Sequence, residues 1–236
     1  MQQPVPHPYY ERDPDTKGTC MNGKTIELKD SQGNAFKAYL SLPKGGRGPG
    51  VVMGIDIHGL RPLYHEIADL FAEQGYLTIL PDYFWDVQRG EDGSYRTTLK
   101  FPTCVEVVTT SMAALKQMPE CNGKLAITGF CLGGNLAYLG VARFGADAAA
   151  SYYGTRIHTF LDEVDAIKKP LLLHIAEHDQ TYPDAERDKI LATVKKNPRI
   201  TAHVYKAPHG FASSSYTPDA AQLAHARTFE LFNTLK

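Results

Sequence analysis

The chain has few cysteines, no excess of charge of either sign and no long apolar run. Its four cysteines, Cys20, Cys104, Cys121 and Cys131, form no C-x-x-C pair in 236 residues, so neither a disulfide framework nor a zinc site is expected. The 25 basic and 26 acidic residues leave a net charge of −1, which gives nucleic acid or an anionic membrane no electrostatic attraction. No stretch approaches the ~20 apolar residues of a membrane-spanning helix.

The N-terminal segment lacks the apolar core of an export signal. Four prolines among its first fourteen positions predict an irregular arm over residues 1–23. With 43% hydrophobic and 22% charged residues, the chain has the composition and length of one globular domain over residues 1–236. Sparse, unpaired cysteines favour a reducing compartment. We therefore expect a cytoplasmic monomer or small homo-oligomer that acts on a small molecule and uses no cofactor, nucleic acid or membrane.

The pattern of apolar residues predicts strands that alternate with helices. Residues 25–30 and 36–43 alternate apolar and polar positions around a turn, as in a hairpin. Further strands are predicted at 48–57, 76–82, 124–130, 148–154, 170–179 and 200–207. Helical periodicity appears over 63–75, 102–118, 132–145, 184–196 and 219–235. Eight strands in this arrangement predict an α/β fold with one mostly parallel sheet covered by helices.

Cys131 lies between glycines, in the segment GFCLGG, where a predicted strand meets a predicted helix. A nucleophile on such a sharp turn needs small neighbours two positions away, and Gly129 and Gly133 occupy those positions. The N-terminus of the following helix favours a thiolate or an oxyanion, and the amide of Leu132 would be an oxyanion donor. The alternative is a small buried cysteine at a tight turn.

A nucleophilic cysteine needs a base, and the base needs an orienting carboxylate. Asp179 follows one predicted strand and His209 follows the last, in the chain order nucleophile, acid, histidine. All three side chains would then emerge at the carboxyl edge of the sheet, where open α/β sheets bind ligands. Glu177 is the competing acid and His178 the competing base, but the loop position favours Asp179 and the chain order favours His209.

With these three residues in order, the chain resembles the dienelactone hydrolase family of α/β-hydrolases from about Lys24 to its C-terminus. The resemblance rests on the segments GFCLGG, IDIHGL, QGYLTILPDYF, SYYG, AEHDQTYP and HGFASS. It implies the α/β-hydrolase fold and a carboxylic ester hydrolase. In such enzymes a cysteine thiolate attacks an ester or lactone carbonyl, the histidine moves the proton, and water resolves the acyl-enzyme.

The resemblance also implies roles for two residues after the third strand. Family members place there a carboxylate that contacts the resting thiol and helps to generate the thiolate, and Asp56 has that position here. The next amide, that of Ile57, would be the second oxyanion donor. The alternative for Asp56 is an aspartate that caps its own loop. His58 receives no role.

The chain departs from the family at Ser213. Members that hydrolyse dienelactone bind the substrate carboxylate with arginines, one of them four residues after the catalytic histidine, where this chain has Ser213. Serine does not replace a planar bidentate donor, so we expect neutral substrates. Arg89 and Arg96 cannot be aligned with the second arginine. Trp85 and Tyr152 follow strands and would line an apolar substrate pocket; the alternative is core packing.

Other functions place cysteine at such a turn. A glutamine amidotransferase would require a His-x-Glu pair, which the chain lacks. A redox-sensing or binding protein would use Cys131 as an oxidisable thiol, but the accompanying Asp179 and His209 argue against it. The same residues could also attack neutral phosphotriesters or thioesters.

Overall fold

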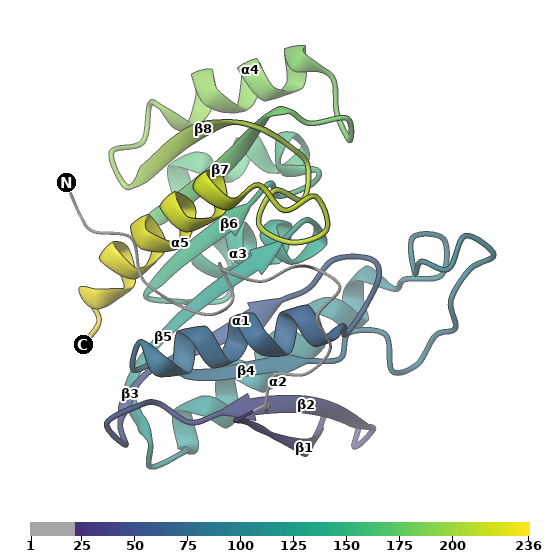
Figure 1. Ribbon diagram of the computed structural model, residues 1–236, viewed down its shortest axis with the longest axis vertical. Helices are drawn as coiled ribbons and strands as arrows, with labels where there is room; N and C mark the ends of the chain where they lie inside the picture. The colour runs from purple at the N-terminus through teal and green to yellow at the C-terminus, as the bar shows by residue number, and fades with distance from the viewer. Residues whose placement is uncertain (1–21) are drawn as a thin grey trace. The chain divides into compact units, whose positions relative to one another are not determined.

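The computed structural model describes residues 22–236, which divide into two compact units (Figure 1). One unit consists of residues 22–125 together with Lys236, and the other of residues 126–235. The irregular arm predicted over residues 1–23 lies almost entirely outside the described residues, and the prediction of one domain over residues 1–236 stays a prediction.

Residues 22–125 contain four strands that pair in the order β1-β2-β4-β3. The predicted hairpin pairs the first two strands antiparallel, and the last two run parallel. Gly33 forms its turn with a φ of 85°, which glycine adopts without strain. The elements are β1 Lys24–Lys29, β2 Ala35–Ser41, β3 Gly48–Gly54, α1 Pro62–Glu73, β4 Leu77–Pro81 and α2 Phe101–Gln117.

Residues 126–235 carry four parallel strands in the order β5-β6-β7-β8. The first of them begins in the other unit and brings the chain into this one. The elements are β5 Cys121–Phe130, α3 Leu132–Ala142, β6 Ala148–Tyr152, the 3₁₀ helix η2 Ile157–Ala166, β7 Leu171–His178, α4 Asp184–Val194, β8 Ile200–Pro208 and α5 Pro218–Asn233.

The prediction of an α/β fold is confirmed, and all eight predicted strands are present in the described part of the chain. The segment η2 was not predicted. Its φ and ψ angles depart from helical values at Phe160, where two short turns meet. Runs this short and tight carry little of the 3.6-residue periodicity from which helices are recognised.

Parallel strands bring their carboxyl ends to the same edge of a sheet. Within residues 126–235, Cys131 follows β5, Asp179 follows β7 and His209 follows β8. Within residues 22–125, Asp56 lies two residues beyond β3. No helix among residues 22–236 combines the length and the apolar character needed to cross a membrane.

Candidate active site

Cys131 occupies a sharp turn between β5 and α3, as the glycine pattern predicts. Its φ of 56° and ψ of −111° are sparsely populated by residues other than glycine. The turn is also sterically closed, because a Cβ atom on Gly129 would lie 2.3 Å from the carbonyl oxygen of Gly133. Only glycine fits at position 129, so the glycines that flank Cys131 allow the chain to adopt this backbone conformation.

Hydrogen bonds to one neighbouring segment hold the backbone of Cys131. Its N–H donates to the carbonyl of Tyr152 at 3.0 Å, and its carbonyl accepts from the N–H of Thr155 at 3.1 Å. Leu132 begins α3, so its N–H has no acceptor within the helix. The positive end of the helix dipole at this point favours negative charge beside the cysteine.

His209 and Asp179 form a buried pair beside Cys131. His209 Nδ1 donates to Asp179 Oδ2 at 2.7 Å, with the two side chains 11% and 1% exposed. Asp179 Oδ1 accepts from the N–H of Thr181 at 2.9 Å and from its hydroxyl at 2.6 Å. Sequence reasoning missed Thr181, although a polar residue two positions after an aspartate is the usual partner in such a turn.

The surroundings of His209 favour its protonated form. Burial lowers the pKa of the imidazole, but the hydrogen bond with Asp179 and the interactions with Cys131 outweigh it and raise the pKa to about 9. Nδ1 is bonded to Asp179. Nε2 is buried and makes no hydrogen bond of standard geometry with the described residues. Nε2 is therefore the nitrogen that can exchange a proton with the thiol. This arrangement can hold an imidazolium next to a thiolate.

Because its pKa is raised from 6.5 to about 9, His209 makes the free energy of unfolding depend on pH. Such a group stabilises the fold fully below its unfolded pKa, and the contribution is lost as the pH rises through the folded pKa. We expect the unfolding free energy to fall between about pH 6.5 and 9, by at most about 3 kcal/mol. Denaturant titrations across this range measure it.

His209→Gln should remove most of this pH dependence. His203→Gln, at a half-buried position in β8, is the matched control and should keep it. An equal slope in wild type and His209→Gln would contradict the assignment.

The competing acid and base are placed differently. His178 is exposed, and Glu177 is half-buried, its carbonyl accepting from Arg187 at 2.7 Å. Asp179, by contrast, is 7% exposed and bonded to His209. The structure therefore brings together the acid and histidine that chain order favours.

Asp56 is buried and its carboxylate is fully engaged within residues 22–125. Oδ1 accepts from the N–H of His58 at 2.8 Å, while Oδ2 accepts from Arg61 Nη2 at 2.5 Å and from the Tyr64 hydroxyl at 2.6 Å. Burial of a carboxylate requires such partners. Sequence reasoning missed Arg61 and Tyr64.

The turn after β3 also fixes the peptide of Ile57. The Asp56 carbonyl accepts from the N–H of Gly59 at 3.2 Å, which sets the plane of the peptide that carries the Ile57 N–H. The Ile57 carbonyl accepts from the N–H of Tyr95 at 2.7 Å. The hydrogen bond from the His58 N–H to Asp56 is the one expected if Asp56 only caps its own loop. The role of the Ile57 N–H as an oxyanion donor stays a prediction.

The predicted substrate-binding residues have different surroundings. Tyr152 is fully buried and its hydroxyl lies 2.7 Å from Thr228 Oγ1, a typical core contact. Trp85 is half-buried, and its indole N–H has no hydrogen bond within the described chain. Ser213 is 6% exposed and accepts a 2.8 Å hydrogen bond from Tyr153. Their roles toward a substrate stay predictions.

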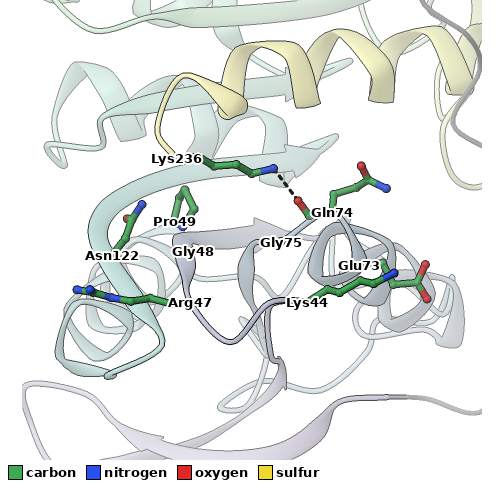
Figure 2. Close-up of a pocket in the computed structure, with 9 residues that line it drawn as sticks. All are labelled: Lys44, Arg47, Gly48, Pro49, Glu73, Gln74, Gly75, Asn122 and Lys236. Carbon is green, nitrogen blue, oxygen red and sulfur yellow. Dashed lines mark hydrogen bonds between the residues drawn. The ribbon is translucent and has the colours of Figure 1, made fainter.

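A cavity of about 310 Å³ lies at the amino end of β3, within residues 22–125 and Lys236 (Figure 2). Its cations do not converge: Lys236 Nζ donates to the Gln74 carbonyl at 2.8 Å, and Arg47 Nε donates to the Cys121 carbonyl at 3.3 Å. It contains no pair of nucleophile and base. Residues 22–236 also hold no cluster of three or more His, Cys, Asp or Glu arranged for a metal ion.

The chain has the α/β-hydrolase fold. A dienelactone hydrolase-like promiscuous phosphotriesterase from metagenomic libraries matches it with a TM-score of 0.77 at 19% identity, over 91% of this chain and 99% of that chain. The chain belongs to the dienelactone hydrolase family, whose sequence profile matches residues 36–236. The carboxymethylenebutenolidase of Pseudomonas sp. strain P51 is 31% identical over 91% of this chain and 95% of its own length.

A second relative agrees with this assignment. The carboxymethylenebutenolidase of Pseudomonas putida is 29% identical over 89% of this chain and 96% of its own length. The resemblance inferred from the sequence is thereby confirmed. The chain is a hydrolase of the dienelactone hydrolase type.

Proposed function

We propose that this hydrolase cleaves carboxylic esters or lactones through an acyl-enzyme on Cys131. The observation that carries the proposal is the buried hydrogen bond of 2.7 Å between His209 Nδ1 and Asp179 Oδ2, on a histidine whose pKa Cys131 helps to raise. The relatives named as carboxymethylenebutenolidases support the same reaction class.

In the first half-reaction the Cys131 thiolate attacks the carbonyl carbon, a C–S bond forms and the carbonyl oxygen becomes an oxyanion. The Leu132 amide at the start of α3 is the proposed donor to that oxygen, with the Ile57 amide as the second donor that the resemblance implies. The His209 imidazolium then gives its proton to the leaving oxygen as the C–O bond breaks. A leaving alcohol and a thioester result.

In the second half-reaction neutral His209 takes a proton from water. The resulting hydroxide attacks the thioester, the carboxylic acid leaves, and thiolate and imidazolium are restored. Asp179 keeps the Nδ1 proton in place throughout, so that Nε2 does the exchange. For Asp56 we retain the proposed role of assisting thiolate formation, with the loop cap as its alternative.

A substrate panel tests the proposal. Neutral aryl esters and small lactones should be hydrolysed by the wild-type enzyme, and alkylation of Cys131 should abolish turnover. A wild-type enzyme that hydrolyses none of them, or an alkylated enzyme of unchanged rate, would refute it. Peptide mass spectrometry must show that Cys131 is the alkylated residue.

Neutral phosphotriesters are a second proposed substrate class. The structural neighbour named as a promiscuous phosphotriesterase supports it, together with the absence of an arginine at position 213. A neutral aryl phosphotriester in the same panel should react more slowly than the esters and lose its turnover with the same alkylation.

We further propose that neutral substrates are preferred, because Ser213 replaces an arginine that binds carboxylate in related enzymes. Ser213→Arg should favour a carboxylated aryl ester over its neutral analogue. The ratio of the two kcat/KM values should rise by about 10- to 100-fold, which corresponds to the free energy of one charge-assisted hydrogen bond. Matched ester pairs measure the ratio.

Ser213→Ala controls for loss of the bond from Tyr153 and should leave this ratio unchanged. If the wild-type enzyme already prefers the carboxylated ester, another residue binds the anion and the proposed preference is wrong.

A further inference from the structure

Tyr153 links the segment that holds Cys131 to the loop that holds His209. It lies directly after β6 and has a φ of 38°, in the left-handed region that bulky residues avoid. Its N–H donates to the carbonyl of His174 in β7 at 2.7 Å, which fixes this strained backbone. A strained aromatic residue beside a candidate active site calls for a functional explanation.

On the backbone side, Tyr153 lies between the two residues that bond to the cysteine. Tyr152 accepts from the N–H of Cys131, and Thr155 donates to its carbonyl. Gly154, the next residue, is equally constrained, because a Cβ atom there would lie 2.9 Å from the carbonyl carbon of Gly134. Movement of the chain at Tyr153 would therefore be transmitted to the turn that carries Cys131.

The side chain of Tyr153 contacts three residues of the loop after β8. Its ring meets that of His209 edge to face, with centroids 4.9 Å apart, and that of Phe211 at 5.1 Å. Its hydroxyl donates to Ser213 Oγ at 2.8 Å. The tyrosine is 1% exposed, so these contacts are shielded from water.

We propose that Tyr153 is a positioning residue that sets the separation and orientation of Cys131 and His209. This inference rests on the proposed function only in taking those two residues as nucleophile and base. It also gives Ser213 a structural task, which is to hold the Tyr153 hydroxyl. Loss of that bond should let the loop carrying His209 move relative to the cysteine.

The test uses the reaction of Cys131 with iodoacetamide, followed by mass spectrometry from pH 5 to 10. The imidazolium of His209 favours the thiolate, so a displaced His209 should slow alkylation near neutral pH and shift the profile to higher pH. Tyr153→Phe and Ser213→Ala should each slow alkylation at pH 7 by about three- to tenfold. The double variant should react no more slowly than either single variant, because both remove the same bond.

Tyr138→Phe is the matched control. Tyr138 is another fully buried tyrosine, and its hydroxyl donates to the Phe160 carbonyl at 2.8 Å. This variant should lose thermal stability without changing the alkylation profile. If Tyr153→Phe fails to fold, Ser213→Ala removes the bond from the other side.

An unchanged alkylation profile in Tyr153→Phe would overturn the inference. If Tyr153→Phe does not fold, an unchanged profile in Ser213→Ala has the same meaning. Alkylation rates that fall additively in the double variant would also overturn it. Alkylation requires no ester turnover. An enzyme inactive toward every ester, but with the expected profile shift, would therefore refute the proposed function and leave the inference standing.

Discussion

Replacing Cys131 with alanine is expected to lower kcat/KM for a neutral aryl ester by about 10⁴-fold or more. The substitution removes the sulfur while keeping the turn, the Leu132 amide and the buried histidine–aspartate pair. Substrate binding and the proposed oxyanion donors would remain, and these alone cannot form an acyl-enzyme. Steady-state kinetics and the absence of an acylated peptide after rapid quenching measure the effect.

Cys121→Ala is the matched control for this variant. Cys121 is also buried, at 5% exposed, but its sulfur accepts from the N–H of Gly123 and lies at the start of β5, outside the residues proposed for catalysis. It should retain near-wild-type turnover. Near-wild-type turnover in Cys131→Ala would instead refute the proposal that Cys131 is the nucleophile.

The second large effect concerns His209 acting as one unit with the cysteine. His209→Ala should reduce kcat by about 10³-fold or more, since neither the leaving group nor the attacking water would then have its proton donor or acceptor. Adding His209→Ala to Cys131→Ala should cost little further, because the histidine has no function without the sulfur. Asp179→Asn should act in the same direction, because the carboxylate orients the ring.

His203→Ala, a change in β8 away from the proposed catalytic residues, should leave kcat near the wild-type value. The four enzymes needed for the double-mutant cycle are wild type, the two single variants and the double variant. Losses that multiply independently would indicate a different base.

The sequence predicted the features that depend on backbone pattern. Gly129 and Gly133 indicate a closed turn because a Cβ atom at the first would collide with the second, and this is visible from residue types alone. Asp179 and His209 were predicted to lie together from their order after predicted strands, because parallel strands share a carboxyl edge, and their side chains do form a hydrogen bond.

The sequence could not distinguish Tyr152 from Tyr153. Both follow an apolar run, and side chains on a regular strand alternate between faces. The left-handed φ of Tyr153 breaks that alternation, so its ring meets His209 while that of Tyr152 stays among core groups. The partners of Asp56 were missed for a similar reason. Arg61 and Tyr64 lie at the start of α1, and only the folded turn brings their side chains to the carboxylate.

The backbone at Cys131 has a consequence for how such a protein can change over generations. With a φ of 56° and a ψ of −111°, this position suits glycine better than any residue with a side chain, and the conformation costs on the order of 1–3 kcal/mol. Substitution by glycine would relieve that cost and remove the only side chain with a thiol at the turn. Substitutions that increase stability at this position therefore remove the thiol. A cysteine persists there only while selection favours the function of its sulfur.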